Sequence, residues 1–231
     1  MSTYVMSDIH GKYDEYLEML LKIKFSNKDK LYILGDVIDR GPDPIKILRH
    51  TMYADNIELL MGNHEKMMLD SASTNKEISI DANAMWEWNG GYTTKKEFVK
   101  HTKEVRQEII DYLAKLEWYK IVEIGDKKFF LSHAALCMRD GDTFEETLER
   151  EIKSEEILWN RRDLMFWENT SEYIFVHGHT PVGKWHPFGF YEILSYDNDK
   201  KINIDCGCAR NERLGCLRLD DMCQFYVECE K

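Results

Sequence analysis

The 231-residue sequence has no long apolar run, because no stretch approaches the roughly 20 apolar residues that a membrane-spanning helix needs. It also lacks an excess of positive charge: 31 Lys and Arg face 42 Asp and Glu, a formal net charge of −11. Nonspecific binders of nucleic acid or of anionic membranes need a broad positive surface, so neither partner is expected. No basic region or cleavage site precedes the first strand-like residues, and we therefore expect a cytoplasmic protein.

Cysteine is present, but not in a zinc-binding pattern. No C-x-x-C pair is followed by a second such pair, and five of the six cysteines crowd the C-terminal end. Structural zinc or disulfides are the alternative; we expect free, partly buried thiols. The cysteines are Cys137, Cys206, Cys208, Cys216, Cys223 and Cys229.

The order of elements along the first third of the chain predicts an α/β fold. Apolar runs typical of buried strands begin near the N-terminus and recur at 30–34 and 57–61, and apolar residues have helical spacing over 13–25 and 45–53. Strand, polar motif and helix thus follow one another repeatedly. This rhythm predicts a mainly parallel sheet covered by helices, with ligands beyond the carboxyl ends of its strands. We expect one domain over residues 1–231.

The rest of the chain predicts a helical insertion and a second sheet. Residues 65–116 are mostly helical and polar, with a turn required by Asn89, Gly90 and Gly91, and we expect a helical cap there. A charged helix is expected over 144–157. Strands are expected at 119–124, 128–131, 173–176, 189–194, 201–204, 215–219 and 223–227. Those near the C-terminus suggest a second, largely antiparallel sheet.

The polar residues at the strand ends suit divalent metal ions. Carboxylate, amide oxygen and imidazole bind manganese, iron or zinc, and the lack of thiolate among them argues against a structural zinc cage. Asp36 is the natural bridge between two ions, because it follows the middle one of the first three strands. Any one of these residues alone is more simply a helix cap or a packing residue, but five ordered clusters favour a metal site. The candidate ligands are Asp8, His10, Asp36, Asn63, His133 and His179.

Five motifs in chain order resemble those of the calcineurin-like metallophosphoesterases. They are Asp8-Ile9-His10-Gly11, Gly35-Asp36-Val37-Ile38-Asp39-Arg40-Gly41, Gly62-Asn63-His64-Glu65, His133 and Gly178-His179-Thr180. Asp39-Arg40-Gly41, with Trp86 and Asn89-Gly90-Gly91, is similar to the phosphoprotein phosphatase branch, which includes small bacterial and phage serine/threonine phosphatases and their diadenosine-tetraphosphatase relatives. The resemblance implies a four-layer αββα sandwich of two mixed sheets flanked by helices.

The resemblance also implies a ligand set for two divalent ions, with manganese as the first choice and iron or zinc as alternatives. One ion would be bound by Asp8, His10 and Asp36. The other would be bound by Asp36, Asn63, His133 and His179. A hydroxide bridging the ions would attack phosphorus in line.

Further residues match the family's acid and its phosphate-binding groups. His64, oriented by Asp39, would protonate the leaving group, and Arg40 would bind the phosphate. A second arginine is expected between His133 and His179, with Arg161 as the better candidate and Arg162 as the weaker one. The candidate substrate-binding residues are Arg40, Arg161, Asn63 and His64.

Three aromatic residues have two interpretations each. His177 either orients a metal ligand or packs at a strand end. Trp86 and Trp88 either line a substrate groove or attach an irregular loop to the core, and we favour the second.

We therefore expect a two-metal phosphatase acting on phosphoserine and phosphothreonine in proteins. The first alternative is the same chemistry on a dinucleotide polyphosphate such as diadenosine tetraphosphate. The second is a catalytically inactive module that binds metal or phosphate. Specificity is expected to lie in residues 70–116 and in the loops, so the shared catalytic motifs do not separate phosphoprotein from small phosphoester substrates.

Overall fold

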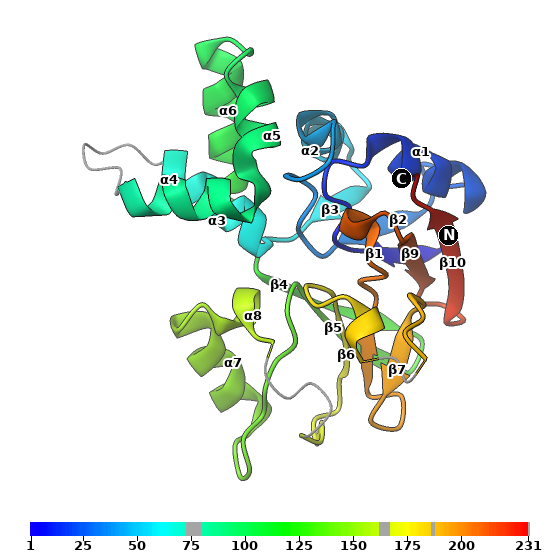
Figure 1. The fold of residues 1–231 in the computed structure, drawn as a ribbon. Coiled ribbons are helices and arrows are strands. Elements are labelled where there is room, and N and C mark those ends of the chain that lie inside the picture. The colour runs from blue at the N-terminus through cyan, green and yellow to red at the C-terminus, as the bar shows by residue number, and fades with distance from the viewer. Residues whose placement is uncertain (73–79, 162–166, 186–187, 231) are drawn as a thin grey trace.

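Two five-stranded sheets lie between helical layers in the computed structural model, which describes residues 1–72, 80–161, 167–185 and 188–230. Figure 1 shows helices α1–α6 on the side of the first sheet and helices α7 and α8 beside the second, with both chain ends near α1 and β10. The fold is thus α/β, with two mixed sheets flanked by helices. No helix within the described ranges is long and apolar enough to cross a membrane.

The first sheet has the order β10-β9-β1-β2-β3. Its parallel part is β1 (Thr3–Met6), β2 (Lys30–Ile33) and β3 (Ile57–Leu59), as the sequence predicted. Strand β9 (Arg213–Arg218) pairs antiparallel with β1, with Val5 opposite Leu217, and β10 (Cys223–Glu228) pairs antiparallel with β9 at the edge of the sheet. The expectation that these last strands belong to a second antiparallel sheet was wrong, because their apolar faces complete the first sheet.

The second sheet has the order β4-β5-β6-β8-β7 and is also mixed. Strands β5, β6 and β8 are parallel, whereas β4 and β7 are antiparallel edges. The bounds are β4 (Tyr119–Ile124), β5 (Lys127–Ser132), β6 (Ile174–His177), β7 (Leu194–Tyr196) and β8 (Lys201–Asn203). The predicted hairpin of β4 and β5 is confirmed.

The predicted strand at 189–194 was wrong, since only Leu194 of that range is in a strand. The preceding segment is held by packing of the Tyr191 ring instead. A Cβ atom added to Gly183 or Gly207 would lie 2.5 or 2.7 Å from that ring. The segment therefore packs against Gly183 and Gly207 through the Tyr191 ring and does not pair with a neighbouring strand.

The helices and short helical turns occupy the links between strands. On the side of the first sheet they are α1 (Tyr13–Lys22), α2 (Pro44–Tyr53), α3 (Asn63–Ala72), α4 (Ile80–Trp86), the π-helical turn η1 (Glu87–Gly91), α5 (Tyr92–Phe98) and α6 (Lys103–Leu113). Elsewhere they are α7 (Phe144–Lys153), α8 (Glu156–Trp159), η2 (Val182–Lys184) and η3 (Cys208–Arg210). The helix expected over 144–157 is interrupted at Glu155, whose φ of 60° starts a new helix.

Side-chain alternation along the strands builds three apolar cores, one between each pair of layers. Met6 and Ile33 face the helices on the first sheet, whereas Val5 faces the space between the sheets. Likewise Phe129 points between the sheets and Phe130 points toward α7 and α8. The period of two is that of buried strands, so each sheet separates two cores.

The helical stretch at 65–116 is confirmed as helical over its described residues, and Figure 1 shows α3–α6 standing together away from the chain ends. The expected turn is present: Gly90 has a φ of 101°, which interrupts the helix. Trp86 is buried, whereas Trp88 is 91% exposed. That these helices form a cap of their own stays a prediction.

Candidate metal centre

The strand ends that carry the candidate site have an unusual backbone. Of the 13 non-glycine residues with positive φ in the described ranges, six are candidate site residues. Such conformations cost free energy and persist only where the surroundings enforce them. Their concentration here sets this edge of the two sheets apart from the rest of the molecule. The six are Asp8, His10, Asp36, Asp39, Arg40 and His179.

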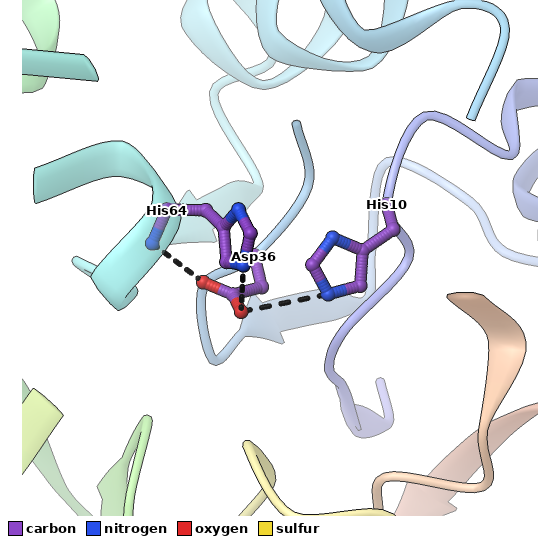
Figure 2. A group of neighbouring side chains, drawn as sticks. All are labelled: His10, Asp36 and His64. Atoms are coloured by element: carbon purple, nitrogen blue, oxygen red, sulfur yellow. Dashed lines mark hydrogen bonds and ion pairs between the residues drawn. The ribbon is translucent and has the colours of Figure 1, made fainter. Parts of the chain in front are cut away.

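One group of possible ligands consists of His10, Asp36 and His64 (Figure 2). Oδ2 of Asp36 lies 3.5 Å from Nε2 of His10 and 3.8 Å from Nε2 of His64. The backbone N–H of His64 donates to Oδ1 of Asp36 at 3.0 Å. Figure 2 shows the carboxylate between the two imidazoles, of which that of His10 comes from the loop after β1 and that of His64 from the first turn of α3.

A second group, formed by Asp36, His133 and His179, shares the same carboxylate. Nε2 of His133 lies 3.4 Å from Oδ2 of Asp36, 3.1 Å from Nδ1 of His179 and 2.8 Å from Oδ1 of Asn63. Asp36 therefore belongs to both groups. That it bridges two metal ions stays a prediction.

The donor chemistry of these groups fits divalent ions. Nδ1 of His133 donates to the carbonyl of Leu34 at 2.7 Å, which leaves Nε2 as an unprotonated acceptor facing the amide oxygen of Asn63. Two acceptors cannot form a hydrogen bond, but both can bind a cation. Two ligand atoms of one ion, each at about 2.1 Å from it, lie roughly 3.0–3.4 Å apart, close to the separations found here.

Protonation favours metal binding as well. Burial lowers the pKa values of His10, His133 and His179 below their usual range, and the neighbouring imidazole of His64 lowers that of His10 further. Neutral imidazole is the form that binds metals. The carbonyl of Ile38 accepts from Nδ1 of His10 at 3.0 Å and so directs its Nε2 toward Asp36.

Asp8 lies beside these groups and belongs to neither of them. Its Oδ2 accepts the backbone N–H of His179 at 2.9 Å and the hydroxyl of Ser7 at 2.5 Å. A Cβ atom at Gly178 would come within 2.1 Å of the same oxygen, so only glycine fits there. The group around His10 contains His64, whereas the expected ligand set of that ion contained Asp8.

The negative charge at this edge includes a residue that the sequence interpretation missed. Burial, and secondarily the Asp8 carboxylate, raise the pKa values of Asp36 and of Asp205 well above their usual range. Asp205 follows β8 and precedes Cys206-Gly207, the same strand-end pattern that identified the other clusters. Three buried carboxylates near one another are compensated most directly by bound cations.

His64 and Asp39 form a buried pair. Nδ1 of His64 donates to Oδ2 of Asp39 at 2.6 Å, and both side chains are almost completely buried. Burial raises the pKa of Asp39 to about 7 and lowers that of His64, with the charge of Arg40 as the second cause for His64. Because both shifts disfavour charge, the interactions around the pair decide where its proton resides.

Two side chains of the helical stretch complete the surroundings of Asp39. Nε1 of Trp86 donates to Oδ2 at 2.8 Å, and the hydroxyl of Thr94 donates to Oδ1 at 2.5 Å. With His64, three donors converge on one carboxylate, and those of Thr94 and Trp86 lower its pKa against the larger rise caused by burial. Trp86 thus attaches the irregular loop to the interior, the interpretation favoured from the sequence.

Arg40 reaches into the site from its rim. Its Nη1 and Nη2 atoms donate to Nε2 of His10 and of His64, both at 2.9 Å. The loop of η1 holds it: the backbone N–H of Arg40 donates to the carbonyl of Gly90 at 3.1 Å, and a Cβ atom at Gly90 would lie 2.8 Å from Cγ of Arg40. Since Arg40 occupies the lone pair of His10, it has to release that nitrogen when a metal binds.

Arg161 is exposed, and its positive charge is among the causes that lower the pKa values of His64, His133 and His179. It therefore lies near the three imidazoles. Arg162, the weaker candidate, is outside the described residues.

Glu65 has a structural part that the sequence interpretation did not assign. Its carboxylate accepts the backbone N–H groups of Asp36 at 2.7 Å and of Val37 at 2.9 Å, and also those of Ile38 and Gly62. One buried side chain thereby fixes the loop that carries Asp36. The sequence signal that could have identified this residue was its position directly after Gly62-Asn63-His64.

His177 packs away from the candidate ligands. Its Nε2 is hydrogen-bonded to the hydroxyl of Tyr196 at 2.7 Å, and its ring lies edge-on to that of Tyr196. Within the described residues, none of the six cysteines forms a disulfide.

Known proteins resemble this chain in sequence. The profile of the family described as calcineurin-like phosphoesterase matches residues 1–207. A "Bis(5'-nucleosyl)-tetraphosphatase, symmetrical" of Buchnera aphidicola subsp. Acyrthosiphon pisum (strain 5A) is 32% identical over 139 residues, which are 59% of this chain and 45% of the relative. The chain thus spans less than half the length of this curated relative.

Solved structures share the fold at low sequence identity. A chain assigned as a diadenosine tetraphosphatase has a TM-score of 0.65 at 16% identity. The match covers 99% of this chain and 94% of that one. A protein serine/threonine phosphatase from Saccharomyces cerevisiae has a TM-score of 0.61 at 15% identity and is covered to 80%, with 100% of this chain.

Proposed function

The chain belongs to the calcineurin-like phosphoesterase family, and we propose that it is a two-metal phosphatase that hydrolyses phosphomonoesters of alcohols. Two bound divalent ions would supply positive charge at the phosphate and lower the pKa of the attacking water. The observation that supports this proposal most directly is that Asp36 belongs both to the group with His10 and to the group with His133 and His179. Manganese is our first choice of metal.

We assign the six candidate ligands as the sequence suggested. Asp8 completes the set with His10 and Asp36, and Asn63 completes the set with Asp36, His133 and His179. Asp8 then has to turn from its present partners toward His10. Asp36 serves both sets. Glu65 and the backbone carbonyls of Leu34 and Ile38 hold the ligands in place.

His64 is proposed as the acid that protonates the leaving oxygen. The carboxylate of Asp39 accepts from its Nδ1, so the imidazolium that the reaction needs is stabilised on one side, while Nε2 faces the site. Arg40 and Arg161 are proposed to bind the phosphate oxygens. The planar guanidinium of Arg40 reaches both His10 and His64 and is therefore close enough to a phosphate held there.

Phosphoserine and phosphothreonine are the substrates that best fit this acid. Their leaving groups are alkoxides, which need a proton as the bond breaks, and the His64–Asp39 pair is built to deliver one. A cytoplasmic place of action is part of this proposal.

A dinucleotide polyphosphate is the second candidate substrate. It is favoured by the names of curated relatives, which are symmetrical bis(5'-nucleosyl)-tetraphosphatases. Both reactions would use the same metal ligands and the same phosphate-binding groups.

The test compares hydrolysis of a phosphopeptide panel, diadenosine tetraphosphate and simple nucleotides at equal concentration with added Mn²⁺. We expect the phosphopeptides to be hydrolysed fastest, and a strong preference for the dinucleotide would transfer the proposal to the second candidate. Hydrolysis of p-nitrophenyl phosphate is measured in parallel. No turnover of it with any divalent metal would leave only an inactive binding module.

A further inference from the structure

A cavity of about 520 Å³ lies between α1, α2 and α5. None of the side chains that line it is a candidate metal ligand or phosphate-binding residue. Its size is within the range of small-molecule sites. It therefore needs an explanation separate from the metal centre.

The cavity is lined by nitrogen-bearing side chains in an otherwise acidic protein. Lys46, Arg49, His50 and His101 surround it, and Glu97 is the single carboxylate among the lining residues. Oε2 of Glu97 already accepts the backbone N–H of Ile45 in α2 at 3.3 Å. The local balance of charge thus opposes the overall net charge of −11.

Arg49 is the cation available to a ligand. Lys46 forms an ion pair with Asp43 at 2.7 Å, whereas Arg49 forms no ion pair with any residue in the part of the chain that the structure describes. A guanidinium donates two parallel hydrogen bonds to a phosphate, which a lysine does not. The cavity therefore presents an anion-binding group with no acidic partner.

Aromatic rings stand beside these cations. Nζ of Lys46 is 5.7 Å from the ring centroid of Tyr13, and Cζ of Arg49 is 5.8 Å from that of Tyr53. Ile45 and Ala54 add apolar surface. Flat rings next to cations suit a ligand that has both a planar base and a negative group.

An unpartnered polar atom lies in the same place. Nδ1 of His50 is buried without a hydrogen-bond partner within the described ranges, and the ring of His50 lies edge-on to that of Tyr16 at 5.4 Å. This atom is shielded from solvent, so Arg49, Lys46 and the tyrosine rings are the groups that the cavity presents to a ligand.

We propose that this cavity binds a nucleoside phosphate, with the phosphate on Arg49 and the base against the tyrosine rings. The ligand would be bound whole, with no bond broken, and the site would act independently of the metal centre. The proposal therefore holds or fails regardless of the substrate at that centre.

The test is a titration of the full-length protein with a fluorescent N-methylanthraniloyl derivative of ADP, after EDTA treatment so that no hydrolysis occurs. We expect saturable binding to one site. Arg49→Gln should weaken it about tenfold, since it removes a charge-assisted contact. Lys96→Gln, on α5 but outside the cavity, should leave it unchanged, and thermal unfolding of each variant shows that the fold is kept.

Arg40→Gln separates this cavity from the metal centre. Binding that persists in Arg40→Gln and is weakened in Arg49→Gln supports the proposal. Absence of saturable binding, or loss in Arg40→Gln alone, overturns it. Competition by inorganic phosphate as strong as by ADP would also overturn it, because the base would then contribute nothing.

Discussion

At the scale of single residues, the proton-donating pair depends on atoms contributed from far along the chain. Asp39 accepts from Trp86, 47 residues away, and from Thr94, 55 residues away. These donors lower the pKa of the Asp39 carboxyl against the effect of its burial and fix its orientation toward His64. The acid is thus tuned by the helical stretch and not by its own loop.

Replacing Trp86 by Phe tests this dependence. An aromatic ring is kept while the Nε1–H that reaches Asp39 is lost, so we expect kcat on a phosphoserine peptide to fall about tenfold. Trp88→Phe is the matched control, because Trp88 is 91% exposed. Equal kcat values for the two variants would mean that the indole donor has no part in catalysis.

His64→Asn tests the acid itself. We expect kcat on a phosphoserine peptide to fall by about 10²–10⁴-fold, since the alkoxide then leaves without a proton. The loss on p-nitrophenyl phosphate should be smaller, because p-nitrophenolate is a stable leaving group. Metal content measured by atomic emission should not change. Loss of metal would instead identify His64 as a ligand, as its distance to Asp36 allows.

At the scale of elements, α7 carries an acid in its buried face. Glu151 is 1% exposed, one of its carboxylate oxygens has no hydrogen-bond partner in the described ranges, and Arg150 is 3.6 Å from the other. Burial, and secondarily Glu156, raise the pKa of Glu151 to about 7. The helix is otherwise well built, with a capping box of Thr143 and Glu146 at its start.

The raised pKa predicts a pH-dependent cost in stability. The folded state holds the proton of Glu151 up to pH near 7, whereas the unfolded chain loses it near the ordinary pKa of a glutamate. The stability that Glu151 contributes is therefore fully present at low pH and is lost as the pH rises through 7. Glu151→Gln should therefore raise the free energy of unfolding by about 2 kcal/mol at pH 8 and little at pH 4.5.

Urea denaturation at the two pH values measures this effect. Glu149→Gln, on the exposed side of the same helix, is the control and should change the free energy of unfolding little at either pH. A stabilisation by Glu151→Gln of the same size at both pH values would contradict the assignment.

At the scale of the whole molecule, two sheets bring their strand ends to one edge and concentrate negative charge there. Asp8, Asp36 and Asp205 are all buried, and each lies close enough to affect another. The metal-free fold therefore carries a repulsion that bound cations relieve.

Mn²⁺ should accordingly raise the melting temperature, by roughly 5–10 °C at a hundredfold excess over its Kd. Asp36→Asn should melt higher than the wild type without metal, because a buried charge is removed, and should lose the Mn²⁺ shift. Differential scanning calorimetry with EDTA or Mn²⁺ measures both effects. Asp55→Asn, at an exposed position, should keep the full shift, and an unchanged shift in Asp36→Asn would refute its bridging position.

Local patterns in the sequence were sufficient for much of this architecture. Continuous apolar runs located β1, β2 and β3, since burial on both faces leaves a local signature, and two strand-like runs around a Gly-Asp turn located the hairpin of β4 and β5. Glycines and polar residues after these runs located Asp8, His10, Asp36 and Asn63. Parallel strands place their carboxyl ends at one edge, so the meeting of these residues followed from the strand order alone.

Only the tertiary structure decided the contacts between distant segments. It placed His64 next to His10 where Asp8 was expected, brought Trp86 and Thr94 to Asp39, added Asp205 to the acidic edge, and joined β9 to β1. Local propensity cannot predict such pairings, because their free energy depends on how whole layers pack. The sequence by itself determined which chemical groups stand at the strand ends, and the packing of the layers determined which of them meet.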